Sequence, residues 1–145
     1  MPRALLRHEV FEYIAAKPRT AKLGVVRADG SPLVAPVWVA LDDDGESLWF
    51  TTGTGTAKGK AIQRDPRVTV CFDDEVPPFS FVIVDGTAEV VPDKALLAHW
   101  ATVIGGRYMG AEHAEAYGRR NAMPGELLVK VTPTKARGTV DVAGW

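Results

Sequence analysis

The stretch Leu48–Val70, LWFTTGTGTAKGKAIQRDPRVTV, decides how the chain is organised. An apolar strand leads into a Thr/Gly-rich loop, and the loop opens a short helix that carries Lys58, Lys60 and Arg64. Pro66 ends this helix and a second strand follows, because proline disfavours helical backbone at the preceding residue and has no N–H. The start of such a helix offers free backbone N–H groups beside a partial positive charge. The pattern predicts a site for an anion such as a phosphate, although a surface loop with solvated lysines fits it as well.

Length and composition narrow the classes of protein that the chain can represent. We expect its 145 residues to form a single domain, residues 1–145, with a substantial core. The formal net charge of −1 argues against a nucleic-acid partner. A single cysteine, Cys71, allows no internal disulfide, so a reducing cytoplasm is the expected location. No apolar run approaches the roughly 20 residues of a membrane span, so none is expected.

Hydrophobic periodicity and turn residues predict an α+β fold. Four strands come first as hairpins and the helices are segregated, which favours an antiparallel sheet or barrel of about six strands with three or four helices. The expected strands are 21–28, 32–41, 46–52, 67–73, 79–91 and 126–131, the last extended loosely over 135–142. The expected helices, besides the lysine-bearing one, are 4–16, one from Pro92-Asp93 that Gly105-Gly106 ends, and 111–120.

Two of these strands, 32–41 and 79–91, are apolar on both faces. Such a strand must be covered on both sides. Pro36 lies within the first of them and predicts an edge position or a bulge, because proline cannot donate to the ladder. We expect one face to fill the barrel and the other to meet a second subunit, which makes the protein a homodimer.

Side chains that would form a self-sufficient catalytic set are not found in the sequence. His8, His99 and His113 are far apart and lack metal-ligand spacing, so no metal site is expected. The segment GTGTAKGK has neither the spacing of a phosphate-binding Walker loop nor the Ser/Thr after its lysine, and no dinucleotide fingerprint is found. If the protein is an enzyme, a cofactor supplies the chemistry and the chain supplies placement and electrostatics, with no catalytic residue to name.

The order of motifs along the chain resembles a known family. A helix and a hairpin come first, GxPxxxPVW and WFTT follow, and the lysine helix ends in RDPRV before a strand that ends in GTAEV. This order looks like the split-barrel flavin fold of pyridoxamine 5′-phosphate oxidase. The motifs closest to the small enzymes that use the deazaflavin coenzyme F420 are Gly30-Ser31-Pro32, Pro36-Val37-Trp38, Ala57-Lys58-Gly59-Lys60, Arg64–Val68, Arg107–Gly110 and Pro124–Leu128. The resemblance covers about Ala21 to Pro133 and implies a six-stranded antiparallel split β-barrel with peripheral helices.

The resemblance also implies roles for individual residues at a cofactor site between two subunits. The anionic part of the cofactor would meet the hydroxyls of Thr51 and Thr52 and the ammonium groups of Lys58 and Lys60. The residues expected beside the ring are Pro36, Val37 and Trp38, with Phe79 reaching across the dimer. For Trp38 and Phe79, ordinary interface packing is the alternative.

The function implied is hydride transfer from reduced coenzyme F420 to a small unsaturated acceptor such as a quinone, a tetrapyrrole or a conjugated lactone. Two alternatives stay open: an FMN-dependent oxidoreductase, and a non-catalytic carrier of flavin, deazaflavin or haem. Related proteins often carry an arginine where this chain has Thr56, which removes one positive charge from the expected anion site. The role of Arg107–Arg120, at the substrate mouth or as a cap on the barrel, also stays open.

Overall fold

Burial alternates along the strands, because successive side chains point to opposite faces of a sheet whose inner face is packed. The computed structural model describes residues 1–144, so Trp145, the last residue of the expected domain, lies outside the described part. The elements are β1 (Arg3–Ala4), α1 (Arg7–Ala16), β2 (Ala21–Val26), β3 (Pro32–Val37), β4 (Ala40–Leu41), β5 (Leu48–Gly53), α2 (Ala57–Arg64), β6 (Arg67–Asp74), β7 (Ser80–Val90), α3 (Lys94–Met109), a 3₁₀ turn (Ala111–His113), α4 (Ala114–Asn121) and β8 (Glu126–Val140).

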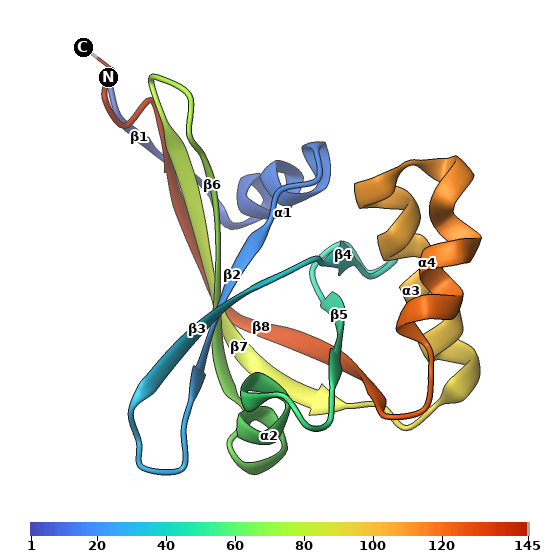
Figure 1. The fold of residues 1–145 in the computed structure, drawn as a ribbon. Helices are drawn as coiled ribbons and strands as arrows, with labels where there is room; N and C mark the ends of the chain where they lie inside the picture. Colours follow the sequence, from blue (N-terminus) through green and yellow to red (C-terminus); the bar gives the residue numbers. More distant parts are fainter. Residues whose placement is uncertain (145) are drawn as a thin grey trace.

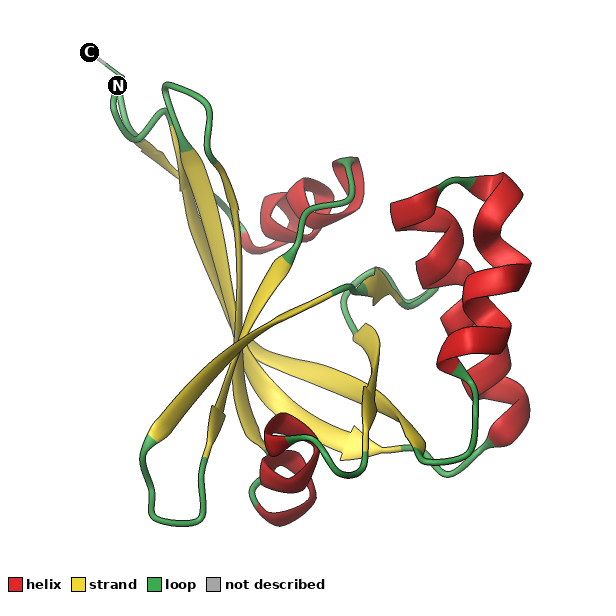
Figure 2. Cartoon of the chain, in the orientation of Figure 1, coloured by secondary structure: helices red, strands yellow, loops and turns green. Residues whose placement is uncertain are grey.

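The strands form one antiparallel sheet in the order β3-β2-β6-β7-β8-β5-β4, with β1 paired to β8. The edge strands β3 and β4 are consecutive in the chain and are joined only by Trp38 and Val39. The sheet therefore has to curl until its two edges meet at these residues (Figure 1). This is the expected α+β split barrel, with the helices outside the sheet (Figure 2).

The strand count differs from the expected six, because the sheet has eight strands. The two additional ones, β1 and β4, are only two residues long. The expected strand 32–41 is divided into β3 and β4. β3 ends at Val37 because the residue paired with it, Ala21, is the first residue of β2. Ala40 and Leu41 then pair with β5 and form β4. Pro36 lies on the edge strand β3, so of the two predicted alternatives, an edge position or a bulge, the edge position is the one found.

Several other predicted boundaries are wrong, and the contacts explain three of them. The first helix begins at Arg7 rather than residue 4, since Arg3 and Ala4 pair with β8 and the Leu6 N–H donates to the Glu9 carboxylate. β8 is one continuous strand with a bulge at Thr134, whose hydroxyl donates to the Asp85 carbonyl.

The third wrong boundary is the predicted helix end at Gly105-Gly106. α3 continues through both glycines to Met109, because they form the surface on which α4 packs. A Cβ on Gly105 would lie 2.5 Å from the Tyr117 Cβ, and one on Gly118 of α4 would lie 2.1 Å from the Thr102 hydroxyl. The glycines therefore permit close helix packing rather than ending the helix.

The core has two parts. The larger cluster fills the curled sheet and includes fully buried Phe50, Phe72 and Leu23, together with Val10 and Ile14 of α1. The smaller cluster joins α3 to the outer face of β4 and β5, where Trp49 and Trp100 stack with their ring centroids 5.3 Å apart. Within residues 1–144, no helix has the length and apolar character needed to cross a membrane.

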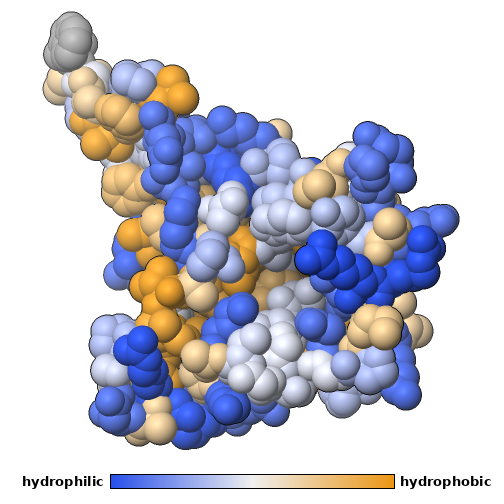
Figure 3. Space-filling model, in the orientation of Figure 1, coloured by the Kyte–Doolittle hydropathy of each residue, from blue (hydrophilic) through white to orange (hydrophobic). Residues whose placement is uncertain are grey.

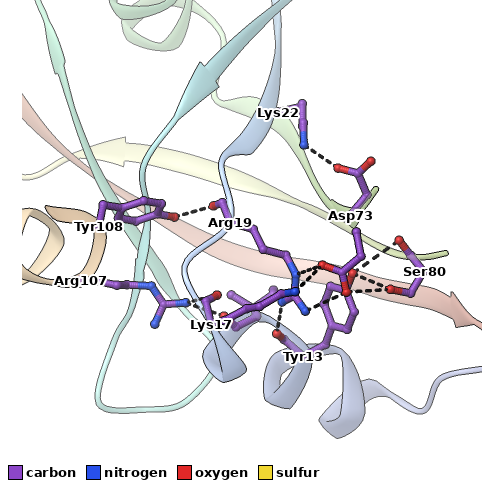
Figure 4. A network of polar contacts seen from close by, with 10 residues as sticks. Tyr13, Lys17, Arg19, Lys22, Asp73, Ser80, Arg107 and Tyr108 are labelled. Atoms are coloured by element: carbon purple, nitrogen blue, oxygen red, sulfur yellow. Dashed lines mark hydrogen bonds and ion pairs between the residues drawn. The ribbon is translucent and has the colours of Figure 1, made fainter. Parts of the chain in front are cut away.

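A polar network fastens the segment between α1 and β2 to the sheet (Figure 4). Arg19 is almost buried and holds both carboxylate oxygens of Asp74, at 2.8 Å and 3.2 Å. Its guanidinium lies 3.7 Å from the centroid of the Tyr13 ring. The Lys17 ammonium and the Ser80 hydroxyl also reach Asp74. These contacts, with the Arg19 hydrogen bonds contributing most, hold the pKa of Asp74 well below its usual value.

We expect Asp74→Asn to lower the free energy of unfolding near pH 7 by about 1–2 kcal/mol. A depressed carboxyl pKa stabilises the fold fully above the unfolded-state value near 4, and this contribution is lost as pH falls towards the folded-state pKa. The substitution should therefore flatten the loss of stability below about pH 4. Urea unfolding followed from pH 2 to 7 measures both effects. The exposed turn residue Asp43, changed to Asn, is the control, and an equal effect of both substitutions would contradict the prediction.

Candidate functional site

A cleft of about 440 Å³ lies where the two edges of the sheet meet. It is lined by the end of β3, the end of β5, the start of α2, the start of β8 and parts of α3 and α4. The lining residues are Thr20, Pro36, Val37, Trp38, Thr51, Thr52, Gly53, Thr56, Lys58, Ile104, Asn121 and Glu126. Figure 3 shows hydrophobic residues gathered on the β3 side of this face and hydrophilic residues over α3 and α4.

The cleft brings together six of the eight residues predicted to bind a cofactor. They come from two segments of the chain: Pro36, Val37 and Trp38 lie at the end of the edge strand β3, and Thr51, Thr52 and Lys58 lie on β5 and α2 near the opposite edge. Their convergence follows from the curl of the sheet. Their role in binding stays a prediction.

Lys60 and Phe79 do not line this cleft. Lys60 is exposed, since two residues along a helix place its side chain about 200° around the axis from that of Lys58. Phe79 lies at the tip of the β6–β7 hairpin, in a separate hollow with Val76 and Asp141. It is 41% exposed and has a φ of 65°, an uncommon conformation for a bulky residue. Within one chain, therefore, Phe79 cannot contribute to this cleft.

The start of α2 is organised by the Thr56 hydroxyl. As the N-cap, Thr56 accepts a hydrogen bond from the Gly59 N–H at 3.1 Å and donates one to the Gly53 carbonyl at 2.8 Å. The Thr52 hydroxyl lies 3.0 Å from the same oxygen, and it must be the donor because the Thr56 proton is already used. Thr56 thus organises the start of α2 without contributing a charge to it.

The N-cap leaves the N–H groups of Ala57 and Lys58 without an acceptor in the described structure. The side chain of Lys58 forms no ion pair among the described residues. The Thr51 hydroxyl is half-buried and likewise forms no hydrogen bond within residues 1–144, whereas Thr52 is only 3% exposed and is committed to the cap. Thr51, Lys58 and two backbone N–H groups therefore offer donors to an anion beside the start of α2.

Gly59 allows this arrangement because α2 lies directly against the end of β5. A Cβ at Gly59 would stand 2.2 Å from the Gly53 carbonyl oxygen and 3.0 Å from the Thr56 hydroxyl. No larger residue fits without moving the helix. The glycine therefore positions Lys58 beside Thr51 and Thr52.

Trp38 is held by the helices on the other side of the cleft. It stacks on Tyr108 with ring centroids 5.0 Å apart and an interplanar angle of 5°, and it contacts Tyr117 at 6.0 Å. The Tyr108 hydroxyl donates to the Arg19 carbonyl at 2.6 Å and accepts from the Val39 N–H at 3.2 Å. One face of the Trp38 ring is thus already covered from within the chain.

These contacts explain much of the segment 107–120, whose role the sequence left open. Arg107 donates to the Ile14 carbonyl at 2.6 Å and to the Lys17 carbonyl at 2.9 Å, which ties α3 to the end of α1 (Figure 4). Tyr108 and Tyr117 pack on Trp38, and Asn121, directly after the segment, lines the cleft. The segment therefore supports one wall of the cleft and caps the sheet.

Sequence reasoning missed six residues of the lining: Thr20, Gly53, Thr56 as a lining residue, Ile104, Asn121 and Glu126. Thr56 had a usable signal, since threonine before a helix is a favoured N-cap. Glu126 had none, because it reaches the cleft only through the pairing of β8 with β5, where it faces Gly53. Burial raises the pKa of Glu126, and the nearby charge of Lys58 acts in the opposite direction.

Known proteins share this fold. A solved structure of a conserved hypothetical protein from Mycobacterium tuberculosis superimposes with a TM-score of 0.78 at 24% identity, covering 92% of this chain and 84% of that one. A FAD-binding protein from Mesorhizobium loti gives 0.72 at 23% identity, covering 96% of each chain. A structure described as an F420 reductase gives 0.61 at 26% identity, covering 86% of this chain and 94% of that one. No curated protein matches the chain by sequence.

The family model described as pyridoxamine 5′-phosphate oxidase matches residues 6–139, which run from the N-cap of α1 almost to the end of β8. This match spans every element that lines the cleft and agrees with the split-barrel topology of the sheet. The chain therefore belongs to the pyridoxamine 5′-phosphate oxidase family.

Proposed function

We propose that the protein is an oxidoreductase that uses reduced coenzyme F420 to transfer a hydride to a small unsaturated acceptor, such as a quinone, a tetrapyrrole or a conjugated lactone. The observation that carries the proposal is the cleft, which has anion donors at one end and apolar and aromatic side chains at the other. The likeness to a protein described as an F420 reductase supports this choice of cofactor.

The residues present fit the phosphate-bearing part of such a cofactor. Lys58 supplies a cation without a competing ion pair, and Thr51 with two backbone N–H groups supplies directional donors. Pro36, Val37 and Trp38 offer an apolar surface of the kind on which a planar ring packs. The fit supports cofactor binding in this cleft.

The chain's own residues act by placement. When bound, the reduced deazaflavin ring supplies the hydride. Trp38, fixed by Tyr108 and Tyr117, limits where the ring can lie, and Ile104 helps to exclude water. Lys58 and Glu126 are the only ionisable side chains of the lining, and both belong to the anion end. We therefore assign no catalytic residue, and the proton that follows the hydride comes from solvent.

An FMN-dependent oxidoreductase is the second candidate, because the terminal phosphate of FMN suits the same donors and the FAD-binding structure shares the fold. A non-catalytic carrier of a flavin or deazaflavin would use the same residues without turnover. A haem carrier is disfavoured, since His8, His99 and His113 all lie outside the described lining of the cleft.

The cofactor choice is tested by titrating the purified protein with coenzyme F420 and with FMN, following absorbance and fluorescence. We expect coenzyme F420 to bind more tightly than FMN, and the loaded protein to reduce at least one acceptor from the three classes named above. Sub-micromolar FMN binding with no response to coenzyme F420 would reverse the order of the two candidates. Binding of coenzyme F420 without turnover of any acceptor would favour the carrier.

Lys58→Ala should weaken cofactor binding by about 1.5–3 kcal/mol, because a charge-assisted hydrogen bond is lost. The effect should decrease as salt concentration rises, since salt screens the interaction. Isothermal titration calorimetry at low and high salt measures both. Lys60→Ala is the matched control, because it removes the same charge from the same helix at an exposed position. It should weaken cofactor binding much less than Lys58→Ala does. An unchanged dissociation constant for Lys58→Ala at low salt would remove this residue from the site.

We propose further that the protein is a cytoplasmic homodimer, with the cofactor at the subunit interface. Two apolar side chains that are exposed in the single chain support an interface. Val34 on the edge strand β3 is 65% exposed, and Phe79 is 41% exposed. In a dimer, Phe79 could approach the cleft of the other subunit. Pro32 and Pro36 limit further strand pairing along β3, so side-chain packing rather than sheet extension would join the subunits.

Size-exclusion chromatography with light scattering should give about twice the 15.6 kDa mass of one chain. Val34→Lys should shift the equilibrium towards the monomer, because a charge would be buried in the interface. Val103→Lys, on the exposed side of α3, is the control and should leave the mass unchanged. A monomer at all concentrations of the unmodified protein would contradict the proposal.

A further inference from the structure

The cleft contains one side chain of each charge, Lys58 on α2 and Glu126 on β8. All other lining residues are uncharged. Neither of the two forms an ion pair within residues 1–144, so their charged groups face the same space without neutralising each other by contact. A ligand group that enters the cleft therefore meets both charges.

The position of Glu126 follows from strand pairing. It lies opposite Gly53, the last residue of β5, and the next residue, Thr54, donates its N–H to the Gly125 carbonyl at 2.9 Å. A carboxylate oxygen of Glu126 is 4.0 Å from the point where a Cβ on Gly53 would stand. Glu126 thus lies beside the loop that leads into α2, at the anion end of the cleft.

An ionised Glu126 lowers the attraction of this end of the cleft for each negative charge of a ligand. Lys58 contributes a full positive charge and the start of α2 a partial one of about half a charge, whereas ionised Glu126 contributes a negative charge. We propose that Glu126 shifts the selectivity of the cleft towards a singly charged phosphodiester and away from a doubly charged phosphomonoester. The proposal rests on the proposed function, of which it specifies the ligand class.

Two physical effects support this selectivity. Repulsion between the carboxylate and a ligand scales with the ligand's charge, so a dianion loses about twice as much binding free energy as a monoanion at the same place. A carboxylate also accepts hydrogen bonds from ligand hydroxyls, which a phosphodiester linking two organic groups can supply from either side. Burial raises the pKa of this carboxyl and the nearby charge of Lys58 acts in the opposite direction, so the test is made at pH 8, far above the ordinary carboxyl value near 4.

The selectivity bears on the choice between the two candidate cofactors. Coenzyme F420 carries its phosphate as a diester, and FMN carries a terminal monoester whose charge approaches −2 above pH 6. Glu126 therefore weakens the binding of FMN more than the binding of coenzyme F420. Lys58 alone would not separate the two, because a single cation attracts the dianion more strongly.

The test uses two probes that differ mainly in charge, dimethyl phosphate and inorganic phosphate, at pH 8. Binding is followed by the backbone amide NMR signals of Ala57 and Lys58 in the unmodified protein and in Glu126→Gln, which keeps the size of the side chain. We expect the substitution to tighten dimethyl phosphate binding about threefold and phosphate binding about tenfold, because the removed repulsion scales with charge. Lys58→Ala should weaken binding of both probes.

Glu89→Gln, an exposed carboxylate on β7 outside the cleft, is the control for a general change in net charge and should leave both constants unaltered. Equal factors for the two probes in Glu126→Gln, or no response of the two amides to either probe, would overturn the proposal. A charge-dependent factor in a protein that binds neither coenzyme F420 nor FMN would support the selectivity of the cleft while contradicting the proposed function.

Discussion

The short connection between β3 and β4 is the constraint on which the rest of the structure depends. These strands form opposite edges of the sheet, yet only Trp38 and Val39 separate them in the chain. An antiparallel sheet can satisfy this connection only by curling until its edges meet. The curl encloses the core and creates a gap at the junction, and the cleft lies in that gap. Fold and candidate site therefore have the same physical origin.

Helix α3 makes the junction rigid. Its Tyr108 stacks on Trp38 and hydrogen-bonds to the backbone on both sides, at Arg19 and at Val39. The backbone N–H of Val39 is thus paired although it lies outside the ladder, which a buried N–H group requires. The same helix packs against α4 through glycines that leave no room for a Cβ. The wall of the cleft is consequently held by tertiary contacts rather than by the sheet alone.

The anion end of the cleft depends on close backbone approach. Gly59 lets α2 rest on the end of β5, and the Thr56 hydroxyl joins the two elements through three hydrogen-bonding contacts. A threonine at this position satisfies the helix start but contributes no charge. The balance of charge in the cleft is then determined by Lys58 and Glu126, and a carboxylate so placed opposes a second negative charge on the ligand.

The sequence by itself determined the elements whose signals are local. Turn residues and two-residue periodicity predicted the main strands, and Pro66 predicted the end of α2. Pro36 predicted an edge position or a bulge, and the edge position is the one found in β3. The loop and helix at Lys58 were found from residue type and spacing alone. The strong local signals at Pro36–Trp38 and Thr51–Lys58 also led, through the family resemblance, to half of the lining that the structure brings together.

Only the tertiary structure decided the features that depend on contacts between distant residues. Gly105 and Gly106 were expected to end a helix, because their local propensity is poor, but the space they leave for α4 outweighs that cost. Lys58 and Lys60 look alike in sequence, and helix geometry separates them. Glu126 carries no local mark of a site, since its place in the cleft arises from pairing with a strand more than seventy residues earlier. Strand register and helix packing, which no local pattern encodes, therefore completed the site.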